Sequence, residues 1–291
     1  MHRIAIMPAN RLFSAFALLS LASACCAAEQ EFSFNVAPGI VADAHLRDDG
    51  SIEVGTNRSP KRQHLQASSD EEGDSSLSHD DYNFDGYQDL ESSAVLGQVN
   101  EADTIYLYDP ASNQFRLLQP PSNAKASCEG FWGVTPDAAS KTLTSSCRGG
   151  PLWHTDIYRY DGARLYLYRA FREIYMRVEQ LQPLLALEQA DDLPVLAVWN
   201  SYDPHGKRQD HVVGNPLDIP NGTDALHPLG ARVVPPHVPL HDRPGDDAKG
   251  RYLVAGDQVE LLDASDDERW LQVRYRNPTH GAIVGWLEVP Q

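Results

Sequence analysis

The sequence is short of cysteine, of long apolar runs and of common enzyme motifs. It has 4 cysteines in 291 residues. After residue 28 it contains nothing close to the roughly 18 consecutive apolar residues of a transmembrane helix. The GxSxG, HExxH and GxxxxGKS motifs are absent as well. We therefore expect no membrane span after the N-terminal region and no catalytic activity.

The first 28 residues have the layout of a secretory signal peptide. Basic Arg3 and Arg11 come first, followed by the apolar stretch LFSAFALLSLASACCAA, which ends in small residues. We expect a periplasmic or secreted protein cleaved after Ala28, although the small residues also permit cleavage after Ala24. The string ASAC resembles a lipoprotein signal too, so the alternative is an outer-membrane lipoprotein anchored at Cys25.

Basic residues are scarce relative to acidic ones. The chain has 24 Lys and Arg against 41 Asp and Glu, a net charge of −17. Removal of the first 28 residues lowers the basic count to 22, and the net charge becomes −19. This charge argues against nucleic acid as a partner, because the phosphate backbone attracts basic surfaces. It favours cationic partners such as lysozyme-like wall hydrolases, with an acidic surface that has no partner as the alternative.

Only Cys128 and Cys147 remain once the first 28 residues are removed. In an oxidising compartment two such cysteines are expected to form a disulfide. Closing a loop of this length stabilises a fold by roughly 3 kcal/mol in the chain-entropy model. A nucleophilic cysteine is the alternative, and it would need a lone thiol.

The length predicts two domains after the signal peptide, and the first of them has β patterns. Residues 29–177 contain the alternating runs IYLYD (105–109) and FRLL (115–118) around a turn. The pair Asp161 and Gly162 predicts a hairpin between two further runs. Residues 58–80 are polar and poor in aromatic side chains, so we expect a mobile loop there.

The second half is expected to hold a connector and a small domain. Residues 178–230 are irregular, with one predicted strand at 195–199. Residues 231–291 contain short strands separated by charged turns, typical of a small barrel, and we expect them to fold by themselves. The runs RYLVAGDQVELL, WLQVRY and GAIVGWLEV resemble a bacterial SH3-like domain. That resemblance implies wall binding, with these candidate contacts: Tyr252, Trp270, Tyr275 and Trp286.

The motif DYNFDGYQDL has the spacing of a calcium-binding loop. Oxygen donors stand at alternate positions and Gly86 permits the sharp turn. The candidate ligands are Asp81, Asn83, Asp85, the carbonyl of Tyr87, and Asp89. Position 12 is Ser92 and not the Glu of a true EF-hand, so Asp89 must supply the closing carboxylate. An Asx-rich turn without an ion is the alternative.

This loop, the IYLYD strand, the segment between the two cysteines and the IYRYDGARL hairpin resemble a family of periplasmic calcium-binding proteins. The family has a lysozyme-inhibitor-like β fold and serves as immunity proteins against peptidoglycan hydrolases delivered by type IV secretion. The resemblance implies an exposed inhibitory loop, and by position the candidate here is CRGGPLWHTDIY. Its candidate partner-binding residues are Arg148, Trp153, His154 and Tyr158.

The expected fold is thus mainly β: a lysozyme-inhibitor-like domain with an EF-hand-like calcium loop, followed by an SH3-like small barrel. Two functions stay open. The chain either inhibits a peptidoglycan hydrolase, or it binds peptidoglycan through its C-terminal domain.

Overall fold

The computed structural model describes residues 30–70, 74–188, 195–220 and 224–290. The predicted signal peptide and the candidate lipid-anchor cysteine, Cys25, lie outside the described residues. The described chain is built of antiparallel sheets with one short helix, which confirms the predicted mainly β class. Within these residues no helix is long and apolar enough to cross a membrane.

Two sheets form the N-terminal part. The first contains, in order, β1 (Gln30–Ala37), β2 (Ile40–Leu46), β3 (Ser51–Thr56) and β4 (Gln63–Gln66). The second contains β5 (Ser76–Asp80), β6 (Asp89–Leu96), β7 (Asn100–Asp109) and β8 (Gln114–Leu117), and β9 (Phe131–Trp132) also pairs with β7. The predicted runs at 105–109 and 115–118 therefore lie in paired strands, β7 and β8.

A six-stranded sheet follows in the middle of the chain. It contains β10 (Thr135–Asp137), β11 (Thr142–Gly149), β12 (Leu152–Asp161), β13 (Arg164–Ile174), β15 (Leu196–Tyr202) and β16 (Arg208–Gly214). The predicted hairpin joins β12 to β13, where Asp161 pairs with Arg164 and Gly162 takes a φ of +61°. A left-handed residue suits this tight turn, and glycine adopts that conformation without a steric penalty.

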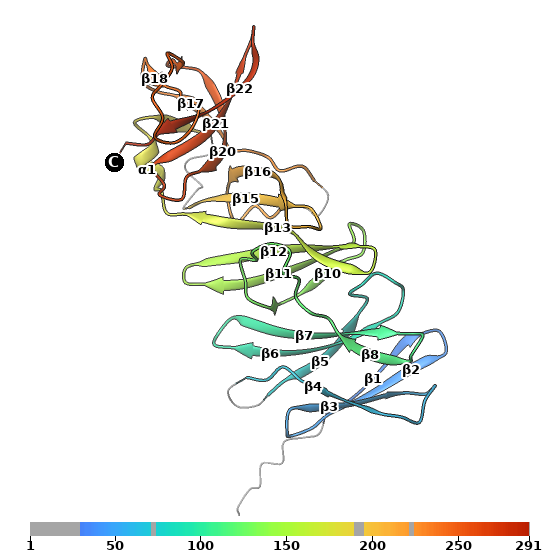
Figure 1. Ribbon diagram of the computed structural model, residues 1–291. Coiled ribbons are helices and arrows are strands. Elements are labelled where there is room, and N and C mark those ends of the chain that lie inside the picture. Colours follow the sequence, from blue (N-terminus) through green and yellow to red (C-terminus); the bar gives the residue numbers. More distant parts are fainter. Residues whose placement is uncertain (1–29, 71–73, 189–194, 221–223, 291) are drawn as a thin grey trace, which may run out of the picture.

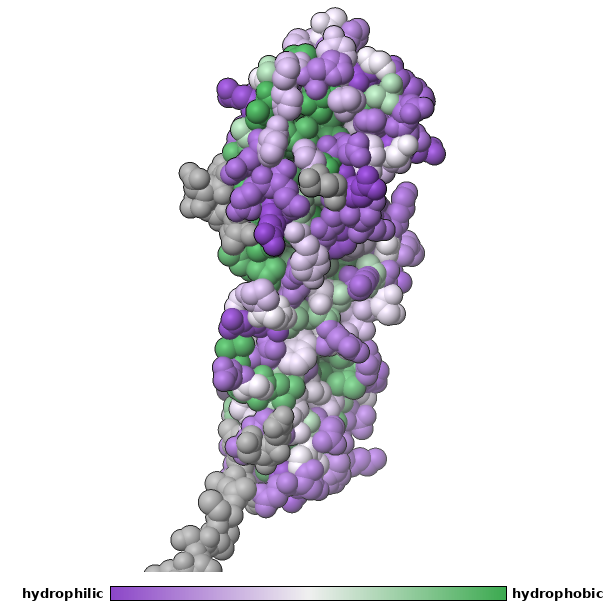
Figure 2. Space-filling view, turned by 90° about the vertical axis from the view of Figure 1, so that its left-hand side faces the viewer, coloured by the Kyte–Doolittle hydropathy of each residue, from purple (hydrophilic) through white to green (hydrophobic). Residues whose placement is uncertain are grey.

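The C-terminal part holds helix α1 (Val178–Leu181) and two sheets. The larger sheet contains β14 (Leu185–Leu187), β17 (Gly230–Val233), β20 (Gln258–Ala264), β21 (Trp270–Asn277) and β22 (Gly281–Glu288). The smaller pairs β18 (Val238–Pro239) with β19 (Tyr252–Leu253). The sheets follow one another along an elongated molecule, from β1–β4 at one end to β22 at the other (Figure 1). Hydrophilic residues cover most of the face in Figure 2, and apolar residues form small patches.

Two ranges are organised differently from the sequence expectation. The polar range 58–80, expected to be a loop, contributes β4 and β5. The range 178–230, expected to be a connector, contributes β14 to the C-terminal sheet and β15 and β16 to the middle sheet. Pairing with neighbouring strands satisfies the backbone N–H and C=O groups of these polar segments, which overrides their weak local propensity.

The second sheet is buried on both faces. Tyr106 packs into a core shared with β1–β4, whereas its neighbour Ile105 packs into a core shared with the six-stranded sheet. Successive side chains of a strand point to opposite faces, so β7 serves both cores. Double burial also encloses acidic side chains, among them Asp89, Glu91 and Asp103.

A third core joins the end of the middle sheet to the C-terminal sheets. Ile174, Leu196 and Val213 from β13, β15 and β16 pack in one cluster with C-terminal residues such as Leu261 and Leu271. The boundary expected at residue 231 therefore runs through a continuous hydrophobic core. The apolar ends of β13, β15 and β16 have no other cover, because burying apolar area is the main favourable term in folding.

Asp103 is expected to make the fold less stable as the pH rises. Burial, with Glu91 and Glu101 nearby, raises the pKa of its carboxyl to about 7. The folded chain thus holds the proton more tightly than the unfolded chain does. The resulting stability is complete below about pH 4 and is lost as the pH rises through about 7, an effect of up to about 4 kcal/mol.

Urea unfolding at pH 5 and pH 8 measures this effect. Asp103→Asn is expected to flatten the pH dependence, because the amide cannot ionise. The control is Asp109→Asn, since hydrogen bonds from Ser112 and Ala111 lower the pKa of Asp109 and keep it ionised across this range. An equal pH slope in wild type and Asp103→Asn would show that Asp103 does not titrate there.

Candidate functional site

The acidic loop, residues 81–89, connects β5 to β6 and is shaped by its own carboxylates. Asp81 Oδ2 accepts a hydrogen bond from Gly86 N at 2.8 Å, and Asp81 Oδ1 accepts one from Asp85 N at 3.0 Å. Asp85 Oδ1 in turn accepts from Tyr87 N at 2.9 Å. Gly86 takes a φ of +90°, which a residue with a side chain rarely adopts. The Asx-turn chemistry therefore brings the carboxylates into one compact loop.

Asp89 closes the loop as the fully buried first residue of β6. Its Oδ2 accepts from Tyr82 N at 2.9 Å and its Oδ1 from Tyr108 N at 2.8 Å. Burial, followed by the nearby Asp85 and Asp81, raises the pKa of this carboxyl to about 8, although the two N–H donors oppose the shift. A cation beside the loop would favour the ionised form of all three carboxylates.

Tyr160 on β12 lies next to the acidic loop. Its ring meets Phe84 edge-on, with centroids 6.2 Å apart. Its buried hydroxyl has no hydrogen-bond partner among the described residues. Burial raises the pKa of Tyr160, and the carboxylates of Asp89, Asp81 and Asp85 raise it further. A buried hydroxyl normally has a partner, so this group is a suitable neighbour for a hydrated ion.

The donor set of the acidic loop fits calcium in its chemistry, because every candidate ligand is an oxygen atom. Across the described ranges, no three or more His, Cys, Asp or Glu side chains are grouped so that they could hold a metal ion. The carboxylates accept backbone N–H groups, and Asn83 Nδ2 donates to Asp85 Oδ2 at 3.0 Å. Each carboxylate oxygen keeps a second lone pair for a cation. The ligand set, including the Tyr87 carbonyl, stays a prediction.

The predicted disulfide between Cys128 and Cys147 is present, with Cα atoms 6.0 Å apart. It ties β11 to the segment that precedes β9. Asp156 fixes the same segment, because its carboxylate accepts hydrogen bonds from Ser127 N and Cys128 N, both at 2.9 Å. The disulfide is consistent with the expected location outside the cytoplasm, where thiols are oxidised.

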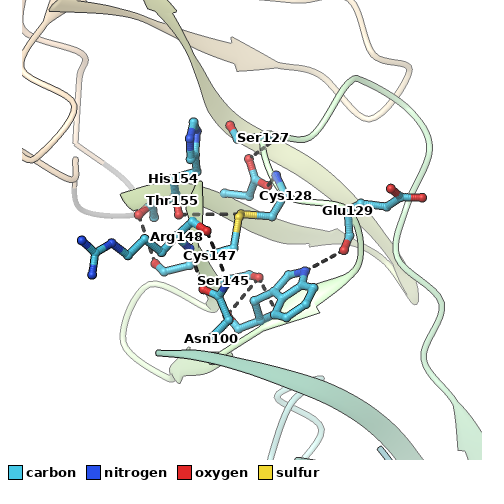
Figure 3. The surroundings of a disulfide bond; sticks show 12 residues. Asn100, Ser127, Cys128, Glu129, Ser145, Cys147, Arg148, His154 and Thr155 are labelled. Carbon is cyan, nitrogen blue, oxygen red and sulfur yellow. Dashed lines mark hydrogen bonds between the residues drawn. A yellow bond between two sulfur atoms is a disulfide. The ribbon is translucent and has the colours of Figure 1, made fainter. Parts of the chain in front are cut away.

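The disulfide lies at the base of a hairpin tip, residues 148–153, between β11 and β12. Asn100 holds the tip from the neighbouring sheet: Arg148 N donates to Asn100 Oδ1 at 2.7 Å, and Asn100 Nδ2 donates to Arg148 O at 3.2 Å. The guanidinium of Arg148 points away from the disulfide (Figure 3). The tip is therefore anchored by two independent contacts while it presents a free cationic side chain.

The four predicted partner-binding residues lie in different environments. Arg148 and Trp153 pair across the hairpin, and Trp153 is 39% exposed. His154 stacks on Phe171 and places Nε2 3.0 Å from a Glu173 oxygen. Tyr158 is 1% exposed and belongs to the core, so its prediction as a contact residue is wrong. The alternation of β12 turns it inward.

The predicted wall-binding aromatic residues also divide into exposed and packed side chains. Tyr252 is 54% exposed and stacks on His237, with centroids 4.5 Å apart. Trp270 is buried, and Tyr275 packs against the C-terminal core. Trp286 is half-buried in β22. Tyr252 is therefore the strongest contact candidate of the four.

Replacing both Cys128 and Cys147 by Ala is expected to cost roughly 3 kcal/mol of unfolding free energy, because the unfolded chain regains the freedom of a 19-residue loop. Urea unfolding of wild type, with and without reductant, and of the double variant measures the loss. Reductant should leave the double variant unchanged. If reduced wild type were as stable as the oxidised protein, the disulfide would not hold the hairpin.

Two residues of this region escaped the sequence analysis: Asn100 and Tyr160. Asn100 contacts a residue 48 positions away, and Tyr160 meets a loop from another sheet. Neither contact has a local pattern, since both depend on how whole sheets stack.

No protein-family model and no curated protein matches the chain. Among solved structures, a Xanthomonas protein described as related to a type IV secretion system is similar to it, with 16% identity and a TM-score of 0.39. The match covers 66% of this chain and 96% of that protein.

Proposed function

We propose that this chain is an exported, calcium-binding inhibitor of a peptidoglycan hydrolase, with no lytic activity of its own. The observation that carries the proposal is the anchored hairpin tip at 148–153. Its backbone is fixed by the disulfide and by Asn100, whereas Arg148 and Trp153 stay accessible. Tryptophan and arginine are the residues most enriched at binding hot spots, and a fixed loop loses little entropy on binding.

The charge of the protein supports a cationic target. Wall hydrolases that act on an anionic cell wall are commonly basic, and a protein with a net charge of −17 attracts them electrostatically. Arg148 then adds a local positive charge for a carboxylate in the target's cleft. Such steering raises the association rate and weakens as salt screens it beyond about 8 Å.

Calcium has a structural role in this proposal. Asp81, Asn83, Asp85, the Tyr87 carbonyl and Asp89 would hold the ion. Its charge would offset the repulsion between carboxylates. The acidic loop leads into β6, which is buried between two sheets, so order in the loop supports both N-terminal cores.

The test is clearing of cell-wall suspensions by purified hydrolases of several families, with and without this protein. We expect inhibition of at least one basic hydrolase, weaker inhibition at high salt, and no clearing by the protein alone. Clearing by the protein alone would overturn the proposal.

A second candidate function is peptidoglycan binding by an SH3-like C-terminal domain, favoured by the exposed Tyr252. It lies beside a cavity of about 360 Å³ whose lining includes Pro235, His237 and Pro239. Sedimentation with purified peptidoglycan tests this function. Loss of sedimentation in Tyr252→Ala, with hydrolase inhibition retained, would separate it from the first proposal.

A further inference from the structure

A cavity of about 450 Å³ opens between β12 and β13. Among the described residues these strands pair only as far as Ile157 with Arg169, and residues 170–174 pair with β15 alone. The segment before the disulfide enters the gap, where Ser127 Oγ donates to Phe171 O at 3.0 Å. Because the buried Asp156 holds this segment through Ser127 N and Cys128 N, the cavity wall is fixed.

The cavity is a cationic spot on an acidic protein. Lys125, Arg172 and Arg208 line it. Arg172 and Arg208 share one carboxylate, Asp263, at 3.5 Å and 2.9 Å. The other acid of the lining, Glu173, faces His154 at 3.0 Å. Three cations therefore face two carboxylates, which leaves an excess of one positive charge.

Donors remain available in this cavity. Arg172 uses one terminal nitrogen, Nη2, for Asp263 and for Ala264 O at 2.7 Å. Arg208 uses Nη1 for Asp263 and for Asn200 Oδ1 at 3.4 Å. Their other guanidinium nitrogens, and the ammonium of Lys125, have no partner within the part of the chain that the structure describes. A guanidinium fork matches a carboxylate with two parallel hydrogen bonds.

Apolar and amide-binding groups complete the cavity. Phe171 is nearly buried and Tyr202 is half-buried, so both offer flat apolar contact. Asn200 and Ser127 can hydrogen-bond a peptide group. The single excess charge suits a monoanion better than a dianionic phosphate.

We propose that this cavity binds a peptide through its terminal carboxylate, with the carboxylate against Arg208, Arg172 and Lys125 and the last side chain against Phe171 and Tyr202. The volume is that of a small-molecule site and holds one or two residues. This site is separate from the hairpin tip and from the acidic loop, and it does not depend on the function proposed above.

Calorimetric titration of the full-length mature chain tests the proposal with N-acetyl-Ala-Ala as the free acid and as its C-terminal amide. The two probes differ only in the carboxylate. We expect the acid to bind at least about tenfold more tightly than the amide, the size of one charge-assisted hydrogen bond. Inorganic phosphate should bind more weakly than the acid.

Variants locate the site. Lys125→Ala, an exposed change, should weaken binding of the acid about threefold or more, and Arg208→Gln about tenfold or more. Lys61→Ala, at an exposed position between β3 and β4, is the matched control and should bind as wild type does. If Arg208→Gln proves unfolded on melting, Lys125→Ala decides. Equal binding of acid and amide, no binding of either, tighter binding of phosphate, or full affinity in Lys125→Ala would overturn the proposal.

Discussion

Cutting the chain after residue 228 is expected to destabilise both fragments severely. Ile174, Leu196 and Val213 are fully buried in a core that residues 231–289 complete. Exposing three such side chains costs roughly 5 kcal/mol or more, which is comparable with the whole stability of a typical domain. Residues 229–291 in turn lose the apolar cover supplied by β13, β15 and β16.

Circular dichroism melting and binding of a hydrophobic dye would be compared for residues 29–228, residues 229–291 and the full mature chain. We expect lower melting temperatures and strong dye binding for each fragment alone. Mixing the fragments should partly restore the full-length transition, because the two halves of the core are complementary. A C-terminal fragment that melts cooperatively alone, beside an N-terminal fragment as stable as the full chain, would establish separate domains.

Calcium is expected to raise the melting temperature by an amount equivalent to about 3 kcal/mol at a hundredfold excess over its Kd. The ion would remove the repulsion between Asp81, Asp85 and the buried Asp89. Wild type would be melted with calcium and with chelator, and Asp85→Ala under the same two conditions. We expect chelation to lower the wild-type transition and to leave the variant nearly unchanged.

The control for this experiment is Asp137→Ala. Asp137 also shapes a turn, since its carboxylate accepts hydrogen bonds from Ala139 N and Ser140 Oγ, but it lies outside the acidic loop. Its response to calcium should equal that of wild type. If calcium and chelator gave one melting temperature in wild type, the acidic loop would be an ion-free turn.

Local patterns predicted the β class well because strands and turns follow local rules. The alternation of β7, the Asp161–Gly162 turn and the Cys128–Cys147 pair all depend on neighbouring residues or on an even cysteine count. The acidic loop was found for the same reason, since its Asp and Asn spacing is itself the signal.

Stacking between sheets was not predictable in this way. The sequence placed Tyr158 on an exposed loop, although the structure buries it between sheets. It also gave no sign that Ile174 and Leu271 share a core. These contacts join residues far apart in the chain, and the energy that selects them comes from burial of whole sheet faces and not from local propensity.

The anchored hairpin tip is the centre of the functional account, so the most direct test changes its exposed aromatic residue. Once a target hydrolase is found, the inhibition constant would be measured for wild type, Trp153→Ala and the control Tyr252→Ala. The account predicts that Trp153→Ala weakens inhibition by about 30-fold or more, the effect of a hot-spot residue, and that Tyr252→Ala inhibits as wild type does. Unchanged inhibition by a folded Trp153→Ala protein would contradict it.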